Sequence, residues 1–172
     1  SASLIFLSCI FIVLARYPSY ILHPRVWAEE SIYFEIFVSA EKWITGFDAI
    51  IYPAYYVLAS RIIGFFASLS SIENIALITT ISGTIVLCIP LIIINYTNSK
   101  HWDSYSKKII LSIFLIFTCS TGEIWMNSTN VGFIFAISSF LILVDEKYGG
   151  IIKQIFYILL ILLGALSGPI SL

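Results

Sequence analysis

Residues 74–96 contain no acidic or basic side chain, and this nearly continuous aliphatic run is the strongest constraint on what the chain can fold into. A helix of about 20 apolar residues crosses the hydrocarbon core of a bilayer. The rest of the sequence agrees, since 59% of its 172 residues are hydrophobic, 11% are charged and the mean hydropathy is +0.99. A soluble domain of this length cannot bury so much apolar surface. We therefore expect an integral membrane protein.

Further apolar stretches predict additional membrane helices, some of them short enough to require a tilted helix or a thin bilayer. The predicted spans are 1–15, 74–96, 109–120, 131–144 and 151–166. The sequence thus predicts an all-α fold, a polytopic bundle that forms one transmembrane domain over residues 1–172. Because the chain opens inside an apolar run without Met and stops where another such run starts, we expect it to be the N-terminal part of a longer protein.

The region between the first two spans, residues 16–71, is aromatic and mildly charged, and we expect it to form an outer loop with interfacial helices. Ser31 and Glu35 recur at helical spacing opposite Tyr33 and Phe37, a pattern typical of an amphipathic helix that lies in the membrane interface.

Two details of this loop bear on its topology. Pro24 suits the first turn of the amphipathic helix. A second helix, predicted over 52–69, is apolar enough either to span the membrane or to lie in its interface, and the sequence leaves both arrangements open.

Basic residues near the span ends predict the orientation, because cytoplasmic loops are enriched in Lys and Arg. If helix 52–69 does not cross, one side holds Lys100, Lys107, Lys108, Lys147 and Lys153. The other side holds Arg16, Arg25, Lys42 and Arg61. The first group lies tightly against span ends, so we assign it to the cytoplasm. We expect a multi-pass protein of the inner (plasma) membrane whose loop 16–71 faces the periplasmic or extracytoplasmic side.

Charge and cysteine usage argue against two other classes of protein. The formal net charge is −1, and the basic residues form no patch with interleaved aromatics, so we expect no nucleic-acid partner. Cys9, Cys88 and Cys119 lie inside apolar runs without metal-ligand spacing, so neither a disulfide framework nor a metal site is expected.

The most informative motif follows the first span and reads Glu29-Glu-Ser-Ile-Tyr-Phe-Glu-Ile36. It resembles the Asp-Glu-x-x-Tyr-x-Glu-Ile pattern in the first outer loop of GT-C glycosyltransferases, polytopic enzymes that use polyprenyl-phosphate sugars. Gly46, Tyr52-Pro53 and Tyr55-Tyr56 are similar in order to the second half of that loop. The resemblance covers the architecture of the whole chain and the motif over 25–61, with Glu29 where the family usually has Asp.

This resemblance implies an inverting hexosyltransferase of the type that modifies cell-envelope glycans such as the O-antigen of lipopolysaccharide. Its partners would be a polyprenyl-phosphate sugar donor, a glycan or lipid-linked acceptor, and membrane lipids. Such a transfer needs a carboxylate to take a proton from the acceptor hydroxyl and positive charge on the departing phosphate. Glu29 or Glu30 fits the first role. Arg25 and Arg61 fit the second, because a guanidinium matches phosphate in a bidentate fork.

The two glutamates differ in the support they receive. The resemblance aligns Glu29 with the catalytic acid of the family. Helical spacing instead places Glu30 on the apolar stripe with Tyr33 and Phe37. We favour Glu29 as the general base and keep Glu30 as the second hypothesis.

Further substrate-binding residues are expected in both outer loops. Tyr52 and Tyr55 either hold a sugar ring or belong to the aromatic belt of the membrane interface. Glu123 and Asn127 are four residues apart, so they can share a helical face that completes the acceptor or phosphate site. Alternatively, they cap helices or bond between helices. We expect no cofactor. A single acid pair can hold a divalent metal ion only weakly, so we expect no metal ion either.

Two alternative functions remain open at this point. One is a GT-C-like polymerase or ligase that joins whole glycan units and shares the outer loop. The other is a non-enzymatic lipid or solute transporter or flippase. A transporter more often has inverted repeats with Gly or Pro breaks near the membrane midplane, a signal to which only Pro90 contributes.

Overall fold

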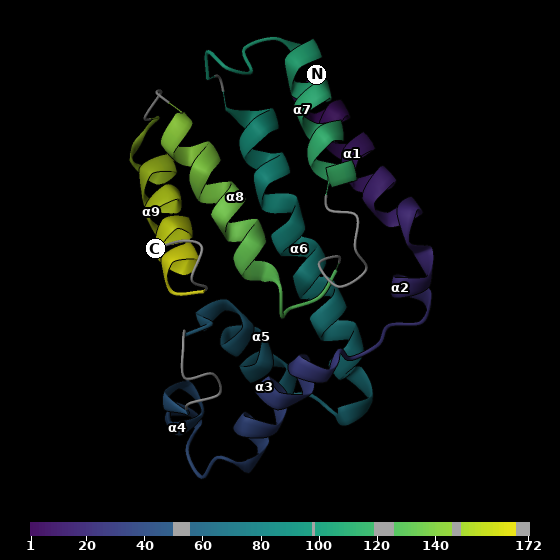
Figure 1. Cartoon of the computed structure of the whole chain (residues 1–172), viewed down its shortest axis with the longest axis vertical. Coiled ribbons are helices and arrows are strands. Elements are labelled where there is room, and N and C mark those ends of the chain that lie inside the picture. Colours follow the sequence, from purple (N-terminus) through teal and green to yellow (C-terminus); the bar gives the residue numbers. More distant parts are fainter. Residues whose placement is uncertain (50–55, 98, 119–125, 146–148, 168–172) are drawn as a thin grey trace.

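The fold is known from a computed structural model that describes residues 1–49, 56–97, 99–118, 126–145 and 149–167. Every regular element in these ranges is helical, as Figure 1 shows, so the predicted all-α class is confirmed. In chain order the helices are α1 (Ala2–Arg16), α2 (Pro18–Leu22), α3 (Ala28–Ser39), α4 (Trp43–Asp48), α5 (Leu58–Ser68), the 3-10 turn η1 (Ile72–Asn74), α6 (Ile75–Tyr96), α7 (Tyr105–Thr118), α8 (Val131–Val144) and α9 (Ile151–Ala165).

Helix α6 is the central element of the molecule. Together with η1 it forms the stretch Ile72–Tyr96, which within the described ranges is the one helix both long and apolar enough to cross a membrane. Shorter apolar helices, α1, α5, α8 and α9, accompany it. The core runs along α6, where Leu91 and Ile94 are joined by Val13 of α1, Ile116 of α7 and Phe135 of α8.

The helices form a bundle with a layer across one end (Figure 1). Helices α1, α6, α7, α8 and α9 run along the long axis of the molecule, whereas α3, α4 and α5 lie below α8 and α9, and α3 and α5 lie beside the lower end of α6, in the view of Figure 1. Within this arrangement α6 packs on α1 and α8, α8 packs on α9, and α3 packs on α5.

The opposite end of the bundle gathers the N-terminus and the α6–α7 and α8–α9 connections (Figure 1). One cavity there is lined by Ala2, Asn95 and Lys108, and a second is lined by Thr97 and Lys153 among others. The lysines expected to share a side therefore lie at one end, and the loop with the paired glutamates lies at the other. Lys147 falls outside the described residues.

Ser31 and Glu35 of helix α3 are exposed while Tyr33 and Phe37 are buried, as their spacing predicts. The helix as a whole is not amphipathic, because Ile32 and Val38 are also exposed and Glu30 is buried. The prediction that Pro24 stands in its first turn is wrong.

The helix begins later because residue 27 remains outside it. Trp27 has an extended backbone with ψ of 153°, and its N–H is bound by the side chain of Glu30, so the first helical residue is Ala28. This contact ends the extended segment that contains Pro24.

Helix α5 depends on the end of α9 for its own beginning. Leu58 N donates to the carbonyl of Leu166 at 2.8 Å, and Ala59 N donates to Ser167 Oγ at 3.0 Å. The first N–H groups of a helix have no partner within the helix, and here α9 supplies the acceptors. The layer of α3, α4 and α5 is thus attached to the bundle at α9 as well as at α6.

Close approach of α3 to α5 requires a residue without a side chain at position 64. A Cβ added to Gly64 would lie 2.9 Å from Tyr33 Cβ and 3.0 Å from the Tyr33 carbonyl carbon and oxygen. Because two of these atoms are backbone, α3 would have to move as a whole to make room.

We predict that Gly64→Ala destabilises the layer by about 1–3 kcal/mol, the usual cost of overpacking a well-filled contact. Thermal unfolding of the purified protein in detergent measures the effect. Gly150→Ala is the matched control, because no atom lies within 4 Å of a Cβ added there. Equal unfolding temperatures for the two variants would show that α3 and α5 are not held at this distance.

Candidate functional site

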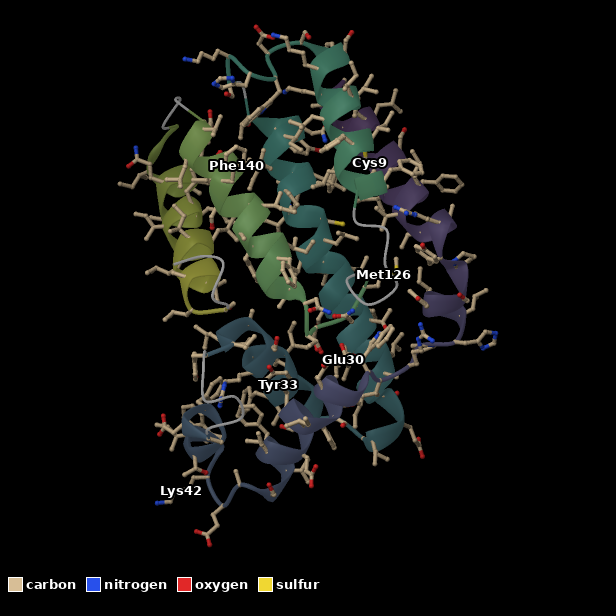
Figure 2. All side chains as sticks on the ribbon, viewed as in Figure 1. Cys9, Glu30, Tyr33, Lys42, Met126 and Phe140 are labelled. Carbon is tan, nitrogen blue, oxygen red and sulfur yellow. The ribbon has the colours of Figure 1, made fainter. Side chains whose placement is uncertain are left out.

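The two neighbouring glutamates at the start of α3 have opposite environments. Glu30 is buried, with 2% of its surface exposed, whereas Glu29 is exposed. Figure 2 shows Glu30 at the junction between the bundle and the layer beneath it. The adjacent positions therefore serve different purposes, one inside the fold and one at its surface.

Three donors satisfy the carboxylate of Glu30. Trp27 N donates to Oε2 at 2.9 Å, which is one half of a capping box. Ser128 donates to Oε1 twice, from its backbone N at 2.6 Å and from its Oγ at 2.9 Å. Hydrogen bonds to an ionised acceptor are among the stronger ones in proteins, and a buried carboxylate needs them. Glu30 thus joins the start of α3 to the segment that precedes α8.

Ser128 extends this network to a third element. Its carbonyl accepts a hydrogen bond of 2.6 Å from Ser60 Oγ on α5, and both serines are buried. The short segment before α8 therefore binds α3 through Glu30 and α5 through Ser60. We refer to Glu30, Ser60 and Ser128 as the serine–glutamate network.

The segment that carries Ser128 is itself tightly shaped. Asn127 Oδ1 accepts from the backbone N of Thr129 at 3.1 Å and of Asn130 at 3.0 Å, so the side chain turns the chain into α8. Met126 has φ of 54°, in the left-handed region that L-residues seldom occupy. Asn127 therefore shapes the turn before α8. It lies outside any helix and does not cap α8, because the N-cap residue is Asn130, whose side chain makes no capping hydrogen bond.

A glycine on α6 makes room for this turn. A Cβ added to Gly83 would lie 2.6 Å from both the backbone N and the backbone O of Asn127. Because Gly83 has no side chain, the backbone of the segment before α8 contacts α6 directly. This contact sets the position along α6 at which Ser128 binds Glu30.

Arg25 lies just before α3 and is exposed. Its guanidinium carbon is 4.7 Å from the centre of the Tyr20 ring and 4.6 Å from that of Trp27, and Nη2 donates to the Tyr20 hydroxyl at 2.9 Å. Cation–π contacts with two rings hold an arginine in place while leaving its edge open to a ligand. In the sequence, Trp27 stands between this oriented cation and the exposed acid Glu29.

Arg61 has a different environment. It is buried, and its Nη1 donates to the carbonyls of Gly46 at 2.8 Å and Phe47 at 2.9 Å, while Nη2 donates to the carbonyl of Ala49. The Tyr56 ring stacks on the guanidinium at 4.5 Å. These carbonyls belong to the C-terminal end of α4, where helix acceptors lack internal partners. The geometry thus gives Arg61 the task of holding α4, and Arg25 is the exposed member of the predicted pair.

The remaining predicted site residues can be placed only in part. Tyr52, Tyr55 and Glu123 lie outside the described residues. Asn127 is brought next to the paired glutamates through its neighbour Ser128. Within the described ranges, no group of three or more His, Cys, Asp or Glu side chains is arranged to hold a metal ion.

Two members of the site were missed by sequence reasoning, Ser60 and Ser128. Ser60 is a small polar residue inside an apolar helix, which is a recognised signal for a hydrogen bond between helices. Ser128 gives a weaker signal, since it stands in a polar run of four residues, 127–130.

We predict that Glu30→Gln lowers the stability of the whole junction. The amide of Gln would place an N–H donor against the donors of Trp27 or Ser128, and an unsatisfied buried group costs about 1–3 kcal/mol. Thermal unfolding in detergent tests this, with Glu35→Gln on the exposed side of α3 as the control. An unchanged unfolding temperature for Glu30→Gln would contradict the described network.

A second prediction concerns Arg61. Arg61→Lys removes the fork that reaches several carbonyls at once, so α4 should loosen by about 1–3 kcal/mol even without any substrate. Hydrogen exchange at the amides of α4 measures this loss. Arg25→Lys is the control, because an exposed lysine can keep the cation–π contacts. If exchange in α4 responds equally to both substitutions, Arg61 does not hold that helix.

Comparison with known proteins adds no assignment to this geometry. No family model, no curated protein and no solved structure matches the chain.

Proposed function

We propose that this chain forms the membrane-embedded part of a glycosyltransferase that moves a sugar from a polyprenyl phosphate to a glycan or lipid-linked acceptor at the outer membrane surface. The observation that carries the proposal is the division between the two glutamates. The carboxylate of Glu30 is buried and accepts hydrogen bonds, whereas the neighbouring Glu29 is exposed. Arg25 is exposed as well, and its guanidinium stacks on the ring of Trp27.

Embedding of the whole bundle in a membrane is supported by the side chains on its outside. Helix α1 exposes Leu4, Leu7 and Phe11. Helix α7 exposes Ile110 and Phe114, among other apolar residues. Exposed apolar faces of this extent on adjacent helices are typical of contact with lipid. On this basis α1, α7, α8 and α9 cross the membrane beside α6, as tilted or short spans.

The orientation also follows from the two ends of the bundle. Lys100 of the α6–α7 connection lies at the end away from α3, as do Lys107 and Lys108 at the start of α7 and Lys153 at the start of α9. If those lysines mark the cytoplasmic side, Glu29 and Arg25 lie on the outer side. A donor lipid in the outer leaflet can then present its phosphate to them.

In the proposed reaction the Glu29 carboxylate takes the proton of the acceptor hydroxyl while that oxygen attacks the anomeric carbon of the sugar. The bond from this carbon to the phosphate oxygen breaks, and polyprenyl phosphate departs with the electron pair. Arg25 stabilises the charge that develops on the departing phosphate. One displacement inverts the anomeric configuration. Glu30 acts here as a positioning residue, because its oxygens already accept hydrogen bonds.

The test uses the purified full-length protein, a radiolabelled polyprenyl-phosphate sugar and a cell-envelope glycolipid extract as acceptor. We expect release of polyprenyl phosphate from the wild type. In Glu29→Gln this release should fall by about 100-fold or more, since loss of a general base costs roughly two to four orders of magnitude.

Two further variants separate catalysis from folding. Glu35→Gln, on the same helix, should keep full activity. Glu30→Gln should lose activity in proportion to the protein that unfolds, and a lower assay temperature should restore part of it. Wild-type release at the background rate, or full activity of Glu29→Gln, would overturn the proposal.

A further inference from the structure

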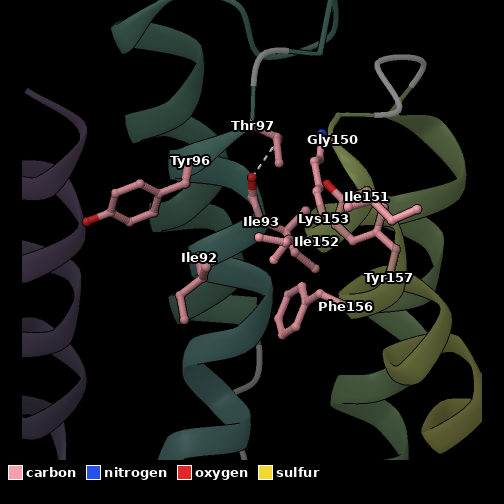
Figure 3. A pocket seen from close by; sticks show the side chains of 10 residues that line it. All are labelled: Ile92, Ile93, Tyr96, Thr97, Gly150, Ile151, Ile152, Lys153, Phe156 and Tyr157. Atoms are coloured by element: carbon pink, nitrogen blue, oxygen red, sulfur yellow. Dashed lines mark hydrogen bonds between the residues drawn. The ribbon is translucent and has the colours of Figure 1, made fainter.

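A groove between α6 and α9 lies at the end of the molecule away from the paired glutamates. It has a volume of about 640 Å³, within the range of about 300–1,000 Å³ typical of ligand sites. Figure 3 shows the groove, with Ile93 of α6 and Phe156 of α9 among the side chains that line it and Lys153 nearer the start of α9.

The lining changes in character from one end of the groove to the other. Ile92, Ile93 and Phe156 supply apolar side chains to the lining. Thr97, Gly150 and Lys153 lie where α6 ends and α9 begins. The lining of the groove is therefore mostly apolar, and among the described residues Lys153, at the start of α9, contributes its one charged side chain.

The charge that a ligand meets in this groove is that of Lys153. Its Nζ pairs with Asp145 Oδ2 at 2.7 Å, but the Asp145 side chain is fully buried whereas that of Lys153 is 27% exposed. The Tyr157 hydroxyl donates to the same Asp145 oxygen at 2.8 Å and helps to enclose it. The first turn of α9 adds the partial positive charge of a helix N-terminus.

We propose that this groove binds an anionic membrane phospholipid, with one acyl chain between α6 and α9 and its phosphate at Lys153. An apolar groove whose end carries a partly exposed lysine and a helix N-terminus complements such a lipid in both shape and charge. The inference rests on the membrane position proposed above, but not on sugar transfer. Lipid binding and transferase activity can therefore fail independently.

Native mass spectrometry of the full-length protein in a mild nonionic detergent tests the site. Phosphatidylglycerol and phosphatidylcholine with identical acyl chains are added in parallel. We expect phosphatidylglycerol adducts to form at lower lipid concentration, by about tenfold, as one charge-assisted hydrogen bond would give. Equal binding of the two lipids overturns the proposal.

Groove-filling and charge-removing variants locate the binding. Ile152→Trp should reduce adducts of both lipids, whereas Ile110→Trp, on the exposed face of α7, should not. Asp145→Asn combined with Lys153→Gln removes both charges without leaving a buried carboxylate unpaired, and should abolish only the preference for phosphatidylglycerol. Lys107→Gln, at the same end but outside the groove, should change nothing.

A cross-link identifies the occupant in the membrane itself and does not depend on the stability of any charge variant. Benzoylphenylalanine placed at position 156 and illuminated in native membranes should acquire the mass of a phospholipid. If it cross-links to another polypeptide or to a distant segment of the same chain, the groove is a protein interface and the lipid proposal is wrong. Absence of a lipid adduct leads to the same conclusion.

Discussion

A carboxylate taken out of water must find donors inside the protein, because leaving it without them costs several kcal/mol. Glu30 is under this constraint, and the three hydrogen bonds that satisfy it come from two places far apart in the sequence, Trp27 and Ser128. The position of α3 is set by this requirement. Through Ser60 the same segment also positions α5.

The site follows from that placement. Once Glu30 is anchored, Glu29 has to point away from the junction, since adjacent helix residues differ by about 100°. Trp27, whose N–H binds Glu30, stacks on Arg25 with its ring. A single buried acid thereby orders the start of α3, and the exposed Glu29 and Arg25 both precede it in the sequence.

The hydropathy of the sequence predicted the apolar helices well. An apolar segment leaves water because of its own composition, whichever helices it then packs against. The prediction of 131–144 coincides with α8, and 1–15 overlaps α1. The pattern of α3 was also readable, since Tyr33 and Phe37 are buried as their spacing indicated. Helix α7 begins at Tyr105, ahead of the predicted residue 109, because its first turn is polar and hydropathy does not detect polar helical turns.

Contacts that depend on a distant partner were not readable in the same way. Arg61 illustrates the difficulty, because the guanidinium fork that suits a phosphate suits a cluster of helix carbonyls equally well. Only the fold shows that Gly46 and Phe47 supply those carbonyls. Ser128 meets Glu30 across 98 residues of sequence, and no local pattern encodes such a pairing. Helix α4 was missed because its N-cap residue, Lys42, is not among the preferred types.

The attachment of α5 to the end of α9 has a consequence for biosynthesis. The amide of Ala59 finds its acceptor on Ser167, 108 residues later in the chain. A ribosome delivers the N-terminal part first, so α5 emerges well before the residue that caps it. The layer with the paired glutamates consequently lacks the acceptors for the start of α5 until α9 has been synthesised. Maturation of the site is thereby coupled to completion of the bundle, and a chain that stalls before α9 is left with an unfinished layer of α3, α4 and α5.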